Sequence, residues 1–311
     1  MLRTSSLRGY HIPGTIDRLI TTLFADDAGV YLSYKDKYSD LTKILSTWCE
    51  ASTAKFNLDK TEVIPIGEPS YRENVLTSRR INPEDDETIP NDIKIAQDGT
   101  AVRYLGAWTG NEINDETPWK KVISEINRAL KKWDKPGITI FGRRLVINME
   151  VGGRIQYLAK VQGMPDNIKK EISHTIRQFM WPNQNIPMIS IETLQRPKNE
   201  GGLALLDIDT RVDAITLTWL KQFLDLSEKR PLWAYVADRL IARNALKSGP
   251  QYNENMKLNV FMQNWSANTS RKSNLPKPLK TLLNTAKKYN VRFDAIKLSP
   301  HLKSVMPIWL H

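Results

Sequence analysis

The sequence predicts an α+β protein in which small antiparallel hairpins precede a series of helices. Residues 1–112 contain short β-prone runs separated by turn signals, whereas beyond Thr117 the apolar residues recur with a helical period. No uninterrupted apolar run is long enough to cross a membrane, so we expect no membrane partner. We expect three regions: hairpins with a helix in residues 1–112, helices in residues 113–182, and a helical C-terminal extension in residues 183–311.

The first of these regions contains an acidic turn. Two β-prone runs, residues 19–24 and 29–34, flank the segment Ala25-Asp26-Asp27-Ala28. This pattern predicts a β-hairpin with two carboxylates at its tip. Adjacent carboxylates on a rigid turn offer the hard oxygen ligands that Mg²⁺ prefers. Aspartate is also a common turn former, so the pair taken alone is more often structural than catalytic.

The remainder of residues 1–112 alternates between helix and strand signals. Helical periodicity begins near residue 41, with Ser39 and Asp40 as candidate N-caps. Residues 68–91 contain several prolines and an acidic run, which predicts a surface loop. The dipeptide Asp98-Gly99 separates two short apolar runs and therefore predicts a second hairpin.

The helix expected after Thr117-Pro118 has two chemically different faces. At about 100° per residue, its apolar side chains share one arc. The cations that share the opposite arc are Lys120, Lys121, Arg128, Lys131 and Lys132. Such a face either contacts phosphates or is simply solvated, and the near absence of acidic residues on it favours contact.

Further helices are expected toward the C-terminus. One covers residues 143–160, although Gly152-Gly153 weakens its middle, and another follows Pro165-Asp166. Helices are also expected at residues 210–226 and 231–246, after a tight turn at Glu200-Gly201-Gly202. The sequence after Ser248 is indecisive. Several tryptophans are expected to be core residues rather than base-stacking platforms: Trp48, Trp108, Trp119, Trp133, Trp181 and Trp219.

Composition limits the partners. The 311 residues carry a net charge of +11, which favours a polyanionic partner because binding releases counterions condensed on phosphates. A merely cationic surface explains the charge equally well. Cys49 is the only cysteine, which excludes an intrachain disulfide within this sequence. Residues 1–15 lack an apolar segment of the secretory type, so we expect an intracellular protein, nuclear or cytoplasmic.

The order of the motifs resembles one family. Phe24-Ala25-Asp26-Asp27 resembles the Tyr/Phe-x-Asp-Asp signature of reverse transcriptases, called motif C. Residues 55–62 (KFNLDKTE) resemble motif D of non-LTR retrotransposon polymerases, and Arg103-Tyr104-Leu105-Gly106 resembles their primer grip. Gly142-Arg143-Arg144 and Glu200-Gly201-Gly202-Leu203 resemble segments of the family's thumb and the helices that follow it. The ordered set is similar to the C-terminal part of the polymerase region of a non-LTR (LINE-like) reverse transcriptase.

The resemblance implies a partial palm in residues 1–112, a helical thumb in residues 113–182 and a helical extension in residues 183–311. It also implies RNA-directed DNA synthesis from deoxynucleoside triphosphates with Mg²⁺. Asp26 would be a metal ligand and Asp27 a supporting carboxylate, and Lys60 would lie near the triphosphate unless it is only a solvated lysine. Tyr104, Leu105 and Gly106 would hold the primer. The implied contacts to the RNA template and DNA primer come from Lys120, Lys121, Arg128, Lys131, Lys132, Arg143 and Arg144.

The sequence departs from the family at one essential point. Two-metal transfer needs carboxylates from two strands, and only Asp17, in a loop-like stretch, precedes Asp26. We therefore expect a truncated fragment that binds Mg²⁺ weakly or not at all and is inactive as a polymerase on its own. The alternative is a non-catalytic nucleic-acid-binding protein that uses the basic thumb face. An inactive, poorly folded relic is a third possibility.

Overall fold

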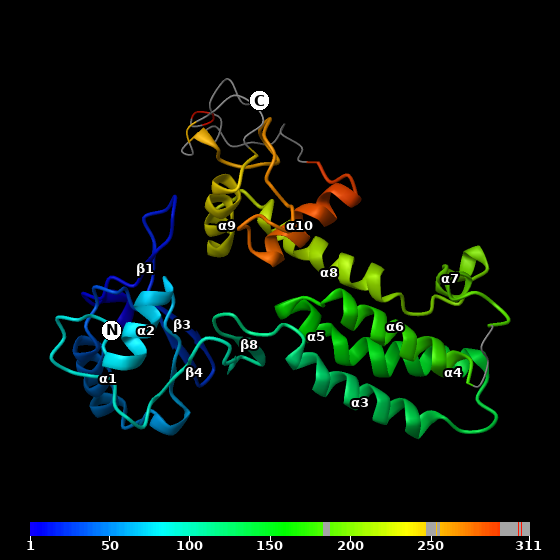
Figure 1. The fold of residues 1–311 in the computed structure, drawn as a ribbon, viewed down its shortest axis with the longest axis horizontal. Coiled ribbons are helices and arrows are strands. Elements are labelled where there is room, and N and C mark those ends of the chain that lie inside the picture. The colour runs from blue at the N-terminus through cyan, green and yellow to red at the C-terminus, as the bar shows by residue number, and fades with distance from the viewer. Residues whose placement is uncertain (183–186, 247–252, 254–255, 293–303, 305, 307–311) are drawn as a thin grey trace. The chain divides into compact units, whose positions relative to one another are not determined.

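The computed structural model describes residues 1–182, 187–246, 253, 256–292, 304 and 306. The chain forms two compact units, Met1–Asn114 and Asp115–His311, which are described separately below (Figure 1). The first unit combines short strands with helices, and the second is helical in its described part, in agreement with the α+β class. Among the described residues, no helix has both the length and the apolarity of a membrane span.

Antiparallel pairs make up most of the strands in the first unit, which begins with the short helix η1 (Leu2–Thr4). The pairs are β1 (Tyr10–His11) with β2 (Arg18–Leu19), β3 (Thr21–Phe24) with β4 (Asp27–Val30), and β7 (Val102–Tyr104) with β8 (Ala107–Thr109). The register of β3 and β4 runs from Thr21 opposite Val30 to Phe24 opposite Asp27. The hairpin predicted around the acidic pair is therefore confirmed.

The hairpin predicted across Asp98-Gly99 is wrong. Strand β6 (Lys94–Ile95) pairs in parallel with β5 (Glu62–Val63), and the Ala96 amide continues that pairing to the Val63 carbonyl at 2.8 Å. The dipeptide does form a turn, with Gly99 at φ +80°, but the turn leads from β6 into β7 without pairing them. A turn signal predicts a change of direction, and the pairing depends on partners distant in the sequence.

The surface loop predicted for residues 68–91 is wrong in its first half, because residues 69–78 form a helix, and residues 79–91 contain no helix or strand. Helix α2 (Pro69–Ser78) begins at a proline, a position that proline favours because its missing N–H would have no helical partner there. Ile81, Ile89 and Ile93 follow it and are buried together with Val75, forming the core beneath the helix. The segment that looked like a polar connection therefore supplies much of the apolar core of this unit.

Helix α1 (Tyr38–Ser52) is capped from a distance. The buried carboxylate of Asp85 accepts hydrogen bonds from the Tyr38 amide at 2.5 Å, the Ser39 amide at 3.2 Å and the Ser39 hydroxyl at 2.8 Å. The expected caps Ser39 and Asp40 are wrong, since both residues lie inside the helix. Asp85 meets the free amides of the first turn, where a negative charge is also favoured by the helix dipole.

The second unit consists of helices in its described part. In chain order they are α3 (Thr117–Trp133), α4 (Ile140–Val146), the π-helical turn η3 (Ile147–Val151), α5 (Gly152–Gln162), α6 (Asp166–Met180), α7 (Ile191–Gln195), the short helix η4 (Lys198–Glu200), α8 (Ile208–Phe223), α9 (Leu232–Arg243) and α10 (Lys277–Lys288). The helices expected near residues 143–160, 210–226 and 231–246 are confirmed, with shifted ends. The turn at residues 200–202 is also confirmed.

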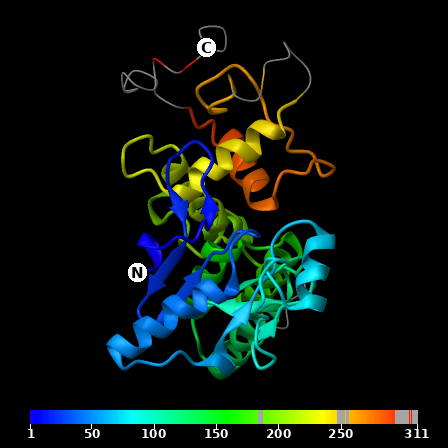
Figure 2. The same ribbon diagram turned by 90° about the vertical axis from the view of Figure 1, so that its left-hand side faces the viewer.

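These helices bury two apolar clusters. One is formed by α3 to α6 and the first part of α8, and it includes Leu194, Leu205 and Leu206. Helices α3 to α6 lie side by side in Figure 1. The packing thus continues across residue 182, where the sequence placed a domain border; that border stays a prediction. The other cluster is formed by the end of α8, α9 and α10. Helices α9 (yellow) and α10 (orange) lie close together in Figure 2.

Candidate functional site

The two aspartates of the acidic turn occupy different positions in the hairpin. Asp26 is the second residue of the two-residue turn between β3 and β4, whereas Asp27 is the first residue of β4. Two-residue hairpin turns require positive φ, and Ala25 supplies it at φ +51°. This conformation is unfavourable for alanine, and such strain is concentrated at functional sites.

Both carboxylates are exposed, and neither has a hydrogen-bond or ion-pair partner among the described residues. Their oxygens suit Mg²⁺ by type. No group of three or more potential ligands is found in the described part of the chain, however. The donor set fits one hydrated ion and does not fit a two-ion centre.

Beside the aspartates, the hairpin exposes an apolar surface. Leu23 is 63% exposed and Phe24 is 67% exposed. In the described structure β3 pairs with β4 alone, which leaves its other edge without a strand. An exposed edge with apolar side chains is a surface to which another strand could add.

Leu105 and Gly106, the last two residues of the predicted primer grip, form a second two-residue hairpin turn, which connects β7 to β8. Tyr104 pairs with Ala107, while Leu105 and Gly106 have φ of +48° and +79°. Two consecutive residues with positive φ are typical of a type I′ turn, which favours glycine at the second position. Leu105 is unusual there, because a bulky side chain disfavours this conformation.

Tyr104 joins the two turns. Its hydroxyl oxygen lies 3.0 Å from Thr22 Oγ1 on β3. A Cβ atom added at Gly29 on β4 would lie 2.8 Å from Thr22 Oγ1 and 2.9 Å from the Tyr104 hydroxyl oxygen. The missing side chain of Gly29 therefore lets Tyr104 pack directly on the acidic hairpin. Sequence reasoning missed Thr22 and Gly29, although a glycine within a strand is a known sign of close approach.

Arg72 fastens the other end of the β7–β8 hairpin to α2. Its Nε lies 2.9 Å from one Asp98 carboxylate oxygen and its Nη2 lies 2.6 Å from the other. Nη2 also lies 3.0 Å from Glu112, and Nη1 donates to the Gly67 carbonyl at 2.6 Å. Since Asp98 precedes β7 and Glu112 follows β8, this nearly buried guanidinium holds both flanks of the hairpin.

Lys60 lies at the end of the short helix η2 (Leu58–Lys60). Its backbone amide binds the Asn57 side chain at 3.2 Å, so the Asn-x-x-Lys spacing forms a local cap. The Lys60 side chain is exposed and forms no ion pair with Asp26, Asp27 or any other described residue. Its predicted role at a triphosphate stays a prediction.

Helix α3 has the two faces that the sequence predicted. Trp119, Ile123 and Ile126 are buried, together with Ala129 and Leu130. The exposed cations are Lys120, Lys121, Arg128, Lys131 and Lys132. Within the described residues none of them forms an ion pair, although the charge of Lys132 acts on the nearby Glu150.

Arg143 and Arg144 differ from these cations. Arg143 donates to the Phe179 carbonyl at 2.7 Å and to Asp134 at 3.3 Å, and its guanidinium lies 5.0 Å from the centre of the Phe179 ring. Arg144 is partly buried, and its Nε has no hydrogen-bond partner in the described structure. The Arg143 side chain therefore contacts residues of its own unit, Phe179 and Asp134.

Three tryptophans are more exposed than expected. Trp48, Trp108 and Trp133 are 39%, 38% and 42% exposed, whereas Trp119 and Trp181 are buried as expected. Trp133 is on the predicted apolar arc but occupies the last position of α3. Helical periodicity predicts the face of a residue, and the extent of the neighbouring helices decides whether the end of that face is covered.

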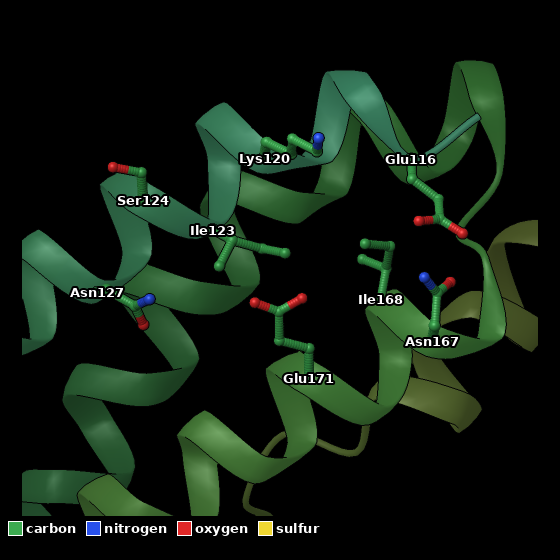
Figure 3. Close-up of a pocket in the computed structure, with 8 residues that line it drawn as sticks. All are labelled: Glu116, Lys120, Ile123, Ser124, Asn127, Asn167, Ile168 and Glu171. Atoms are coloured by element: carbon green, nitrogen blue, oxygen red, sulfur yellow. The ribbon is translucent and has the colours of Figure 1, made fainter. Parts of the chain in front are cut away.

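Two hollows flank α3. One, of about 410 Å³, lies between α3 and α6, where the Glu171 carboxylate points into the space beside Ile123 and Ile168 (Figure 3). Glu116 and Glu171 give it an acidic lining, which disfavours phosphate. The other, of about 310 Å³, is lined by Arg128, Lys132 and Trp133, together with Glu125, Ala129, Glu150 and Arg154.

The sequence matches no family model, and a search of curated proteins found no similar protein.

Proposed function

We propose that this chain is part of a reverse transcriptase of the non-LTR retrotransposon type. The complete enzyme would copy an RNA template into DNA from a primer, with deoxynucleoside triphosphates and Mg²⁺. The observation that carries this proposal is the contact between the Tyr104 turn and the acidic hairpin.

A polymerase needs the primer terminus beside the metal-binding carboxylates, because the primer hydroxyl must be aligned with the reacting phosphate. The resemblance assigns these two tasks to segments far apart in the sequence. The Thr22–Tyr104 contact, which spans 82 positions, brings the strands of those two segments together. The proximity is independent of the motif resemblance and supports the same function.

Crosslinking tests this proposal. A DNA primer ending in a photoreactive nucleotide, annealed to an RNA template, should crosslink to residues 102–109. A primer with the same group ten nucleotides from its end is the matched control and should crosslink elsewhere. Crosslinks from the terminal group that avoid residues 102–109, in a complex that does form, would contradict the proposal.

A second candidate is nucleic-acid binding without catalysis, and the basic face of α3 favours it. Exposed cations that form no ion pair suit sequence-independent phosphate contacts. Filter binding across a salt series tests the phosphate contacts of this face, and the crosslinking experiment above separates the two candidates. Changing Lys120, Lys121, Lys131 or Lys132 to Gln should flatten the salt dependence by about one counterion for each phosphate that is no longer bound. Asp26→Asn and Asp27→Asn should leave it unchanged in either case, whereas only the polymerase proposal places the primer terminus at residues 102–109.

A further inference from the structure

The end of α3 carries a groove in which an indole lies beside cations. Its lining includes Trp133, Arg128 and Lys132 from α3, and Glu150 and Arg154 from η3 and α5. The volume of about 310 Å³ is enough for a single nucleobase with part of its sugar and phosphate. Aromatic faces next to cations are the usual means of binding unpaired nucleotides.

The indole of Trp133 is oriented and remains accessible. Its Nε1 donates a hydrogen bond to Glu150 Oε1 at 3.0 Å, which fixes the edge of the ring. The residue is 42% exposed. Within the described chain, no aromatic ring or cation stacks on it, in contrast to Trp48, whose ring centre lies 5.3 Å from that of Phe56. The Trp133 ring is therefore held in place while part of its surface stays open to a ligand.

The charges of the groove favour phosphate. The Glu150 carboxylate is already bound by Trp133 and Arg154, and these hydrogen bonds hold its pKa below the ordinary value. Arg128 and Lys132 are exposed and form no ion pair among the described residues, although the charge of Lys132 also helps to lower the pKa of Glu150. The groove is lined by one other carboxylate, that of Glu125, which takes no part in the hydrogen bonds of Trp133 and Arg154 described here.

Glu150 lies in an irregular part of the helix. It belongs to the π-helical turn η3, which separates α4 from α5. Such turns are rare and occur frequently at functional sites, because the additional residue changes the direction of the side chains. Here the turn carries the carboxylate that orients Trp133.

We propose that this groove binds one unpaired nucleotide, whose base stacks on Trp133 and whose phosphate contacts Arg128 and Lys132. The inference rests on the nucleic-acid binding proposed for α3 and adds a preference for single strands. A base inside a duplex is stacked on its neighbours and cannot stack on the indole. Because every base has an aromatic face, the groove should show little sequence preference.

The test measures the binding of a labelled single-stranded oligouridylate and of a blunt duplex. Trp133→Leu should weaken binding of the single strand about tenfold, the loss expected for one base stacked on an aromatic side chain. It should leave the duplex within about twofold of the wild type, since the phosphate contacts remain. Trp133→Phe keeps an aromatic ring and should retain most of the affinity. Trp48→Leu, which removes an exposed tryptophan from the other unit, is the matched control and should change neither value.

Crosslinking with the wild-type chain avoids dependence on any variant. An oligonucleotide containing 5-iodouracil should crosslink to Trp133, as identified by mass spectrometry. The inference would be overturned by crosslinks only at other residues, or by a Trp133→Leu variant that binds the single strand as tightly as the wild type does. Either result would leave nucleic-acid binding by the basic face of α3 intact. A wild-type chain that binds neither nucleic acid would overturn both.

Discussion

The hydroxyl oxygen of Tyr104 lies 3.0 Å from Oγ1 of Thr22, although the two residues are 82 positions apart. This contact joins the Tyr-Leu-Gly turn to the hairpin that carries Asp26 and Asp27. It depends on the absence of a side chain at Gly29, beneath the tyrosine ring. The geometry of the candidate site is thus set by a tyrosine, a threonine and a glycine that are not themselves expected to perform chemistry.

Gly29→Ala should displace Tyr104. The added methyl group would lie under 3 Å from both hydroxyl oxygens, so we expect the first unit to lose about 1–3 kcal/mol of unfolding free energy in urea. Gly153→Ala is the control, because a Cβ there meets nothing within 4 Å and lies in a helix, where alanine stabilises. Equal stability of Gly29→Ala and the wild type would show that Tyr104 does not pack on Gly29.

Asp85→Ala should loosen helix α1. Burial raises the pKa of the Asp85 carboxyl, but hydrogen bonds from Ser39, Glu87 and Tyr38 outweigh burial and hold the pKa below its ordinary value. Because the pKa is lower in the folded state, the stability contributed by this group is present above pH 3.8 and is lost as the pH falls through the folded pKa.

We expect Asp85→Ala to cost about 2 kcal/mol at neutral pH, the size of a lost cap with unpaired donors. Hydrogen exchange at the Tyr38 and Ser39 amides reports the loss directly. Asp86→Ala changes the exposed neighbouring acid and should have no effect on these amides. Unchanged protection in Asp85→Ala would contradict the capping role.

Asp238 in α9 should titrate near neutrality. It pairs with Arg230 at 2.7 Å and accepts a hydrogen bond from Asn259, yet burial is the larger influence and raises its pKa to about 6. Since the folded state binds the proton more tightly than the unfolded state, this group stabilises the fold below pH 3.8, and that stability is lost as the pH rises through about 6.

Carboxyl NMR measures this pKa directly, with Asp238→Asn used to assign the signal. A midpoint near the ordinary 3.8 would contradict the prediction and would show that the Arg230 pair dominates. Asp238→Asn should itself cost about 3–5 kcal/mol at pH 7, because it leaves Arg230 buried without a counter-charge.

The chain alone should not extend a primer on an RNA template. Asp26 and Asp27 come from one turn, and a two-ion centre needs carboxylates on separate strands to hold ions about 3.5–4 Å apart. The measurement is incorporation of labelled deoxynucleotide with Mg²⁺ or Mn²⁺. Robust incorporation that disappears in Asp26→Asn would show that a second carboxylate strand is present after all.

The sequence predicted those elements that depend on residues close together in the chain. The acidic hairpin followed from two β-prone runs around a turn, and the faces of α3 followed from helical spacing. The capping of α1 could not be predicted, because Asp85 lies 46 positions from Ser39 and only the tertiary fold brings them together. For the same reason, β6 was predicted to pair with β7 across Asp98-Gly99, whereas it pairs in parallel with β5.

Helix α2 was missed for a different reason. Its sequence is polar, and the acidic run after it is typical of loops, yet Pro69 at the helix start was a readable signal. In the candidate site, sequence reasoning identified the aspartates and the Tyr104 turn. It missed Thr22, Gly29 and Arg72, which hold the two hairpins in place and carry no motif of their own.

Iron-mediated cleavage tests most directly whether the acidic turn lies beside the primer terminus. Fe²⁺ replaces Mg²⁺ at oxygen ligands and, with ascorbate and peroxide, produces radicals that cut nucleic acid nearby. On a bound RNA–DNA primer complex, cutting should be concentrated at the 3′ end of the primer and should disappear in the double variant Asp26→Asn, Asp27→Asn while binding is retained. Cutting spread evenly along the duplex, or unchanged in that variant, would contradict the proposed function.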